Sequence, residues 1–181
     1  MRWLTFVICA VAVVTLQVTI APRVEYLGAR PDWILVLAVF FALNGRSVDV
    51  LIGAWVLGAT ADLFTIERFG LLALSYALAA LLVYGVREYL FREHPLTQFS
   101  VTFAACLAIH IGLVIYRFGI FGLSGGSLGV LAREPLLASL YTGLSALPVH
   151  FVLLRLHGLL GVMPARIRRR RSAGGRSRGF V

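Results

Sequence analysis

Asp62 is the acidic residue with the most informative position, because it lies inside an otherwise hydrophobic segment. Ala54, Gly58 and Asp62 are spaced by four residues, which places them on one face of a helix. A carboxylate in a membrane-spanning helix costs about 3 kcal/mol on insertion scales, so it normally faces a neighbouring helix or a partner. We therefore predict that Asp62 points into a helical bundle. Two roles are open: a partner-binding or ion-coupling acid, or a structural acceptor that caps the turn carrying Glu67 and Arg68.

Histidine is the other residue type in the hydrophobic segments that can move a proton. His110 lies near the middle of one segment, and His150 lies in another. A proton relay needs a second titratable group beside His110, and His150 or Asp62 qualifies only if the fold brings them together. The alternative role for His110 is a structural hydrogen bond to a neighbouring helix.

The motifs that point towards an enzyme are incomplete. The stretch Gly122-Leu123-Ser124-Gly125 matches the G-x-S-G pattern of intramembrane rhomboid proteases, but polar residues follow the serine where those enzymes begin a buried helix. The only asparagine, Asn44, does not supply the His/Asn pair of those proteases. Glu88, Glu93 and His94 lack the H-E-x-x-H spacing of metalloproteases. We predict no catalytic residue and no enzyme activity.

The two cysteines give no indication of a metal, a cofactor or a disulfide. Cys9 and Cys106 each lie in a hydrophobic segment, without C-x-x-C spacing. No phosphate-binding loop or dinucleotide fingerprint is present in the sequence. We expect both cysteines to be small core residues and expect no cofactor.

Hydrophobic residues make up 60% of the 181 residues and lie in long blocks almost free of charge. A soluble domain is usually ~45–50% apolar, and a membrane-spanning helix needs about 20 apolar residues. We predict six transmembrane helices at residues 3–21, 33–43, 48–66, 69–89, 99–121 and 135–160. The segment 33–43 is short, so we expect it to be tilted or partly buried by its neighbours. The chain is then one all-α membrane domain, residues 1–164, with a basic disordered tail, residues 165–181.

Small residues at helical spacing should hold these segments together, because lipid is as apolar as leucine and burial alone does not drive their association. The further candidate stripes are Ala104, Ala108 and Gly112; Ser139, Gly143, Ala146 and His150; and Ala73 and Ala77. We therefore expect a compact bundle.

The net charge of +9 comes from 17 basic residues, all of them arginine. In a hydrophobic chain such an excess indicates cytoplasmic loops and anionic lipid rather than nucleic acid. Six spans place both termini on one side, and that side carries eleven arginines against five on the other, with Arg155 inside the last segment left out. We predict cytoplasmic termini. We also predict that four tail residues contact anionic lipid: Arg168, Arg169, Arg170 and Arg171.

The stretch from residue 30 to residue 76 resembles the family of the rod shape-determining protein MreD. The patterns R-P-[DN], G-x-x-x-D-[LI] and [LF]-G-x-x-A-L occur here in this order and with matching gaps. The matching residues are Pro31, Asp32, Gly58, Asp62, Gly70, Ala73 and Leu74. The resemblance makes these residues candidates for partner binding or for defining the fold.

The resemblance implies a non-enzymatic scaffold of bacterial cell-wall elongation in the inner membrane. Proteins of this family bind the bitopic partner MreC, and with it they belong to the complex that links MreB filaments to the glycosyltransferase RodA and its transpeptidase. Such a scaffold supports rod cell shape and peptidoglycan synthesis. The helical fold implied is similar to the substrate-binding subunits of energy-coupling-factor vitamin transporters. We expect Gly58, Asp62 and Gly70 to shape the outer end of two segments where MreC docks.

The alternative function is a substrate-binding subunit of a small-molecule (vitamin) transporter. Such a subunit needs a polar pocket near the outer face, for which only Gln17, Tyr26 and Trp33 qualify. It also needs a small-x-x-x-small docking surface on the first helix, where this chain has Ala10 and Val14. We therefore favour the scaffold.

Overall fold

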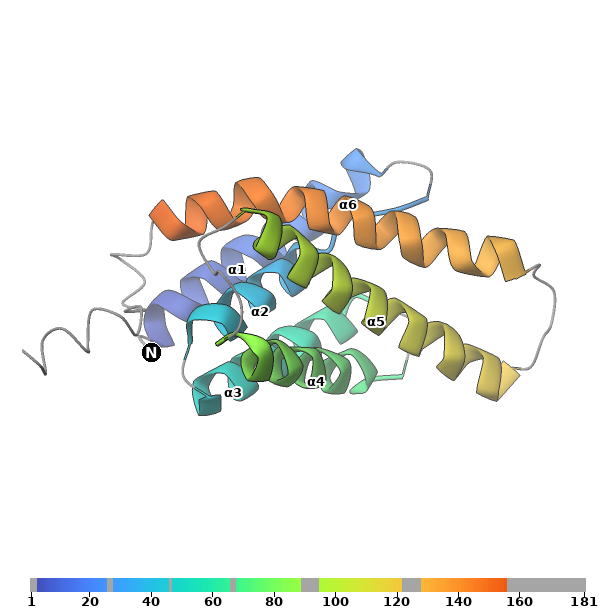
Figure 1. Ribbon diagram of the computed structural model, residues 1–181, viewed down its shortest axis with the longest axis horizontal. Coiled ribbons are helices and arrows are strands. Elements are labelled where there is room, and N and C mark those ends of the chain that lie inside the picture. The colour runs from blue at the N-terminus through green and yellow to red at the C-terminus, as the bar shows by residue number, and fades with distance from the viewer. Residues whose placement is uncertain are drawn as a thin grey trace, which may run out of the picture.

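The computed structural model describes residues 3–25, 28–45, 47–65, 68–88, 95–121 and 128–155. Over these residues the chain forms six α-helices and one short 3-10 helix (Figure 1). The helices are α1 (Trp3–Thr19), α2 (Trp33–Asn44), α3 (Ser47–Asp62), α4 (Leu71–Val86), α5 (Pro95–Phe121) and α6 (Leu128–Arg155), with the 3-10 helix η1 (Ala21–Val24) following α1. The prediction of an all-α chain with six helices is confirmed for the described residues.

The centre of the bundle is α2, whose residues 34–43 are all buried. All five other α-helices contact it. A helix that is apolar on every side is stable where neighbours cover every side. Neighbouring helices, rather than lipid, surround α2. The segment predicted at 33–43 therefore does not need the length of a membrane-spanning helix.

The most extensive helix contact joins α3 and α4. A Cβ atom added at Gly58 would lie 2.6 Å from the Cα atom of Ala73 and 2.6 Å from the carbonyl oxygen of Leu72. Ala54 and Ala77 are also buried. The predicted packing through small residues is confirmed for these two helices.

The second large contact joins α5 and α6. A Cβ atom added at Gly143 would lie 3.0 Å from Cε2 of Phe99 and 3.3 Å from Cβ of Phe103. Ser139, Ala146 and His150 on the same face of α6 are buried. The predicted stripe on α6 is confirmed.

The predicted stripe on α5 is wrong. Ala104, Ala108 and Gly112 are exposed, and among the described residues nothing outside the helix itself lies within 4 Å of a Cβ atom placed at Gly112. The residues that α5 buries are Gln98, Thr102, Ala105, Cys106 and Ile109. The physical reason is that α6 supplies the small residue at this contact and α5 supplies the phenylalanine rings.

Several helix boundaries differ from the predicted ones. The helix expected to end at residue 66 ends at Asp62, and α5 begins at Pro95, four residues earlier than expected. Proline is well suited to the first turn of a helix, because its missing N–H is unpaired there anyway. Pro135, the expected start of the last helix, lies inside α6. The predicted end of that helix at residue 160 lies outside the described residues.

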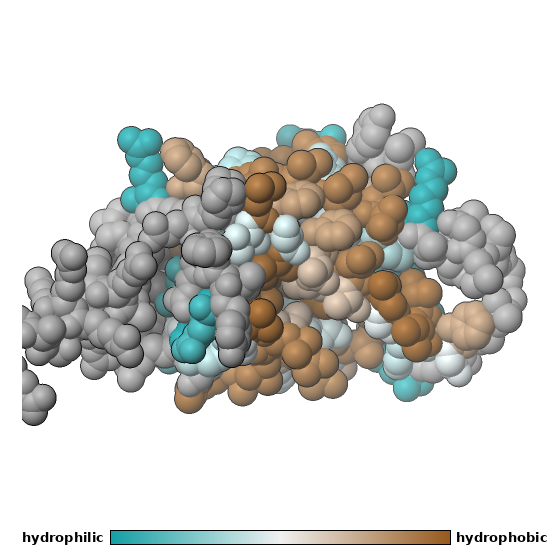
Figure 2. Space-filling view, viewed as in Figure 1, coloured by the Kyte–Doolittle hydropathy of each residue, from teal (hydrophilic) through white to brown (hydrophobic). Residues whose placement is uncertain are grey.

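Hydrophobic side chains dominate the outer surface. Figure 2 shows them over the middle of the visible face, with hydrophilic side chains towards its two ends. By length and composition, Leu96–Gly119 and Arg133–Leu153 are each long enough to cross a membrane, and α1, α2 and α4 contain shorter apolar helices. The start of α1 and the end of α6 lie at the same end of the bundle (Figure 1).

Candidate functional site

Asp62, the last residue of α3, is only 3% exposed, and its carboxylate accepts three backbone N–H groups at the start of α4. Gly70 and Ala73 donate to Oδ2 at 2.9 and 3.0 Å, and Leu72 donates to Oδ1 at 3.0 Å. The first N–H groups of a helix have no partner within that helix, and its N-terminus attracts negative charge. Asp62 therefore fastens the end of α3 to the start of α4.

Two glycines make this arrangement possible. Gly70 has a φ of +98°, a left-handed conformation that strains any residue with a side chain. Gly58 lets the α3 backbone touch the backbone of α4 at Ala73. We call the set Gly58, Asp62, Gly70 and Ala73 the α3–α4 clasp.

Asp32 is the N-cap residue of α2 and contacts two other helices. Its Oδ1 accepts the backbone N–H of Leu35 at 3.0 Å, and its Oδ2 accepts the hydroxyl of Tyr76 on α4. The backbone N–H of Asp32 donates to Oγ1 of Thr142 on α6 at 3.1 Å. The helix start predicted at residue 33 is confirmed, with Asp32 as the N-cap residue and Pro31 one position before it.

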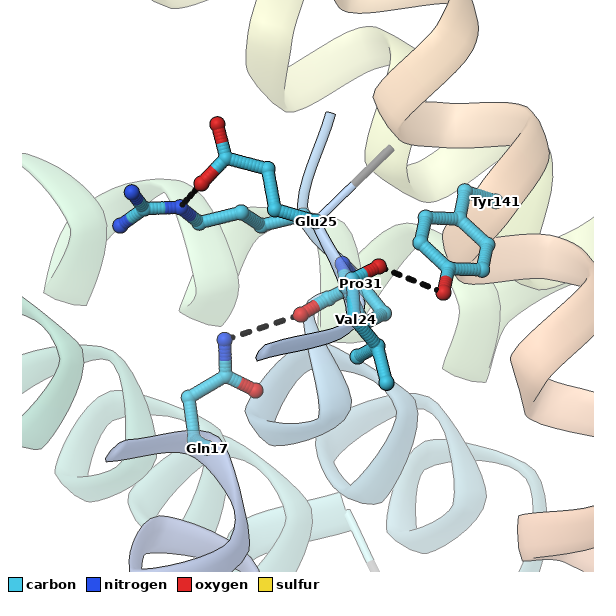
Figure 3. Close-up of polar contacts among 6 residues, drawn as sticks. Gln17, Val24, Glu25, Pro31 and Tyr141 are labelled. Carbon is cyan, nitrogen blue, oxygen red and sulfur yellow. Dashed lines mark hydrogen bonds and ion pairs between the residues drawn. The ribbon is translucent and has the colours of Figure 1, made fainter. Parts of the chain in front are cut away.

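The chain entering α2 is also held from α1 and α6 (Figure 3). The side-chain amide of Gln17 donates to the carbonyl oxygen of Pro31 and accepts the N–H of Trp33, both at 2.9 Å. The hydroxyl of Tyr141 donates to the carbonyl oxygen of Val24 at 2.8 Å. The residues around Asp32 thus join α1, α2, α4 and α6 at one end of the bundle.

The other motif residue, Leu74, takes no part in these polar contacts. Its side chain is 69% exposed on the outside of α4. Leu63 and Phe64 directly after α3, and Phe69 before α4, are also exposed. The α3–α4 clasp therefore holds a turn that exposes Leu63, Phe64 and Phe69, and Phe64 also lines a cavity described below.

The two histidines do not form a relay with Asp62. Nδ1–H of His110 donates to the carbonyl oxygen of Cys106 at 2.9 Å, within the same helix, rather than to a neighbouring one. Nδ1–H of His150 donates to Ala146 at 3.0 Å, and the ring packs edge-on against Phe40. Among the described residues, no group of three or more His, Cys, Asp or Glu side chains is placed to hold a metal ion.

Some predicted features lie outside the described residues. They are Tyr26, the Gly122–Gly125 stretch with Ser124, Glu93 and His94, and the arginine run at 168–171.

A cavity of about 690 Å³ lies beside Asp32, at the end of the bundle away from the start of α1. We call it the Arg30 cavity. Its polar lining includes Gln17, Arg30, Tyr76, His110 and Arg117. Only Gln17 was expected from the sequence. The others were missed because they come from the connection before α2, from α4 and from α5, and only the folded chain brings them together. The one sign of them in the sequence was the presence of polar side chains within apolar segments.

A central apolar helix, a hydrophobic exterior and two helices long and apolar enough to cross a membrane describe a small all-helical protein of the kind found in membranes. The family model of the rod shape-determining protein MreD matches residues 1–156, so the chain belongs to the MreD family. This is a family of membrane proteins with a role in determining rod shape, and it is not known as an enzyme family. No curated protein and no solved structure matches the chain.

Proposed function

We propose that this chain is a non-enzymatic scaffold of the cell-wall elongation machinery in the bacterial inner membrane, and that it binds MreC at the α3–α4 turn. Membership of the MreD family supports the role in cell shape. The observation that carries the docking site is the clasp, which fixes a turn bearing the exposed side chains of Leu63, Phe64 and Phe69. Exposed apolar side chains on a rigid support are typical of protein contacts.

The wider assembly follows from MreC binding. MreC would connect the chain to RodA, its transpeptidase and MreB filaments, and so to peptidoglycan synthesis and rod shape. With both termini in the cytoplasm, the α3–α4 turn faces the periplasm, because it lies at the other end of the bundle from the start of α1 and the end of α6 (Figure 1). The turn then lies on the side where the wall is built.

Co-purification of MreC with variants of the full chain tests the docking site. Leu74→Ala and Phe69→Ala should lower MreC recovery by roughly 5–30-fold, which corresponds to the loss of about 1–2 kcal/mol of contact energy. Leu82→Ala is the matched control, because Leu82 is 61% exposed on the same helix but two turns further from the clasp. Recovery that falls equally in all three variants, or in none, would contradict docking at the turn.

Asp62→Leu tests whether the clasp is needed. The change leaves the three N–H groups at the start of α4 without their acceptor. Loss of MreC from a variant that still inserts and accumulates would support docking through the clasp. Full MreC recovery together with normal rod shape would show that Asp62 has only a structural capping role.

The Arg30 cavity is the observation that favours the alternative, a substrate-binding subunit of a vitamin transporter. Depletion of the chain separates the two functions. The scaffold predicts rounded cells with reduced peptidoglycan incorporation and unchanged vitamin uptake, whereas the transporter predicts lost uptake in cells that remain rods.

A further inference from the structure

The Arg30 cavity follows from the unequal lengths of the helices. The long helices α5 and α6 have 27 and 28 residues, against 12 in α2 and 16 in each of α3 and α4. Figure 1 shows α5 and α6 continuing past the ends of the shorter helices. The cavity lies where this part of α5 faces the ends of α2, α3 and α4. The space is therefore built into the fold.

Most of the cavity wall is apolar. Ile34 from α2, Leu72 from α4 and Ile109 and Leu113 from α5 line it. A volume of about 690 Å³ falls within the ~300–1,000 Å³ range of small-molecule sites, which are usually apolar with a few polar groups. The wall is suited to a hydrocarbon chain.

Two arginines supply the cationic part of the lining. Arg30 pairs with Glu25 through Nε at 2.6 Å, and among the described residues its two terminal nitrogens make no further bond. Arg117 lines the cavity from α5. Both arginines also line a smaller cavity of about 270 Å³, together with Glu134 of α6, so the two side chains stand where the two spaces adjoin. Guanidinium groups bind phosphate through paired N–H donors.

The other polar groups are placed to complement such a ligand. Nδ1–H of His110 donates to the carbonyl oxygen of Cys106, which leaves Nε2 of the ring without a partner among the described residues and, in the neutral ring, able to accept a hydrogen bond. The carboxylate of Asp32 also lines the cavity, but it already accepts the Leu35 N–H and the Tyr76 hydroxyl. The cavity thus places two arginine side chains and one ring nitrogen of His110 beside an apolar wall.

We propose that the Arg30 cavity binds one phospholipid. The phosphate lies between Arg30 and Arg117, an O–H or N–H group of the headgroup donates to Nε2 of His110, and an acyl chain follows Ile34, Leu72 and Leu113. Arginine near the end of an apolar helix extends its guanidinium to the level of the lipid headgroups. Phe64 and Thr65 of the α3–α4 turn also line the cavity. The variants below change residues outside this turn, so they test lipid binding separately from MreC docking.

The test is native mass spectrometry of the full chain in detergent, followed by thermal unfolding after delipidation and addition of one lipid. Wild type should retain one phospholipid per chain, and phosphatidylglycerol or phosphatidylethanolamine should raise its unfolding temperature. Leu113→Trp fills the apolar wall and should abolish retention. Its control is Ile115→Trp, because Ile115 is 66% exposed on the same helix.

A second pair of variants tests the headgroup. Arg30→Gln combined with Arg117→Gln should lose the lipid, and Arg133→Gln, which changes an exposed arginine outside both cavities, should keep it. Phosphatidylcholine, whose headgroup has no N–H or O–H donor, should stabilise wild type less. Equal retention by all variants would overturn the proposal. Arginine-dependent binding of inorganic phosphate without any lipid retention would overturn the assignment to a lipid.

Discussion

Asp32 and Asp62 both place a carboxylate at the start of a helix, but they join different elements. Asp32 caps its own helix and adds a bond from Tyr76, whereas Asp62 caps a helix to which it does not belong. A capping acceptor contributes about 1 kcal/mol, and a negative charge at a helix N-terminus adds to this. These two acids therefore fix the relative positions of α2, α3 and α4 at one end of the bundle.

Gly58 allows a residue-scale prediction about stability. In Gly58→Ala the new Cβ would lie 2.6 Å from backbone atoms of α4, which cannot rotate away as a side chain can. The two helices must separate, and we expect a loss of roughly 1–3 kcal/mol, the range typical of overpacking. Thermal unfolding of the purified protein in detergent measures this loss.

The matched control for that prediction is Gly85→Ala on α4. A Cβ atom at Gly85 has no described residue outside its own helix within 4 Å, and alanine is the better helix former, so this variant should be as stable as wild type or slightly more so. Equal unfolding temperatures for both variants would mean that the close approach at Gly58 does not limit stability.

The sequence revealed part of this residue-scale arrangement. The spacing of Ala54, Gly58 and Asp62 predicted an inward carboxylate, and capping was one of its two predicted roles. The described groups that Asp62 caps are the N–H groups of Gly70, Leu72 and Ala73. The sequence did not indicate them, because they depend on the left-handed conformation of Gly70 in the folded turn. The bond from Tyr76 to Asp32 joins residues 44 positions apart, and no local pattern indicates it.

At the scale of the helices, hydrophobic blocks predicted the number and order of the elements but not their contacts. Six apolar blocks became six described helices because each block is long enough to form one. The stripe at Ala104, Ala108 and Gly112 did not pack, because close approach between two helices requires a small residue on only one of them. The cavity was missed for a related reason, since it depends on where neighbouring helices end.

The α5–α6 contact allows a prediction with an internal control. Gly143→Leu should displace the rings of Phe99 and Phe103, because a Cβ atom at this position already lies 3.0 Å from the Phe99 ring. We expect reduced accumulation and a loss of roughly 1–3 kcal/mol in detergent. Gly112→Leu adds the same side chain to the open face of α5 and should be tolerated. Greater damage from Gly112→Leu would indicate that the exposed face of α5 is covered in the cell.

At the scale of the whole molecule, the basic tail is predicted to bind the inner leaflet. Each arginine near an anionic surface contributes about 1 kcal/mol, so Arg168 to Arg171 together contribute on the order of 4 kcal/mol. A peptide of residues 165–181 should bind phosphatidylglycerol liposomes far more tightly than neutral ones, and 1 M salt should weaken the binding by screening. Replacing the four arginines with glutamine is the control. Equal binding to neutral and anionic liposomes would contradict the prediction.

Membrane orientation is the remaining prediction at this scale, and two independent observations lead to it. The side that holds the termini carries eleven arginines against five on the other side, which favours a cytoplasmic location for that side. The start of α1 and the end of α6 lie together at one end of the bundle, and the α3–α4 turn lies at the other (Figure 1).

Alkaline phosphatase, which is active only in the periplasm, should therefore be inactive when fused after Val181 and active when fused after Thr65 in the α3–α4 turn. Immunoblots must show that both fusions accumulate, because a degraded reporter is also inactive. Phosphatase activity after Val181 would overturn the orientation. Activity at neither position in stable fusions would place the α3–α4 turn in the cytoplasm, and Phe69 and Leu74 could then meet only a cytoplasmic or intramembrane part of MreC.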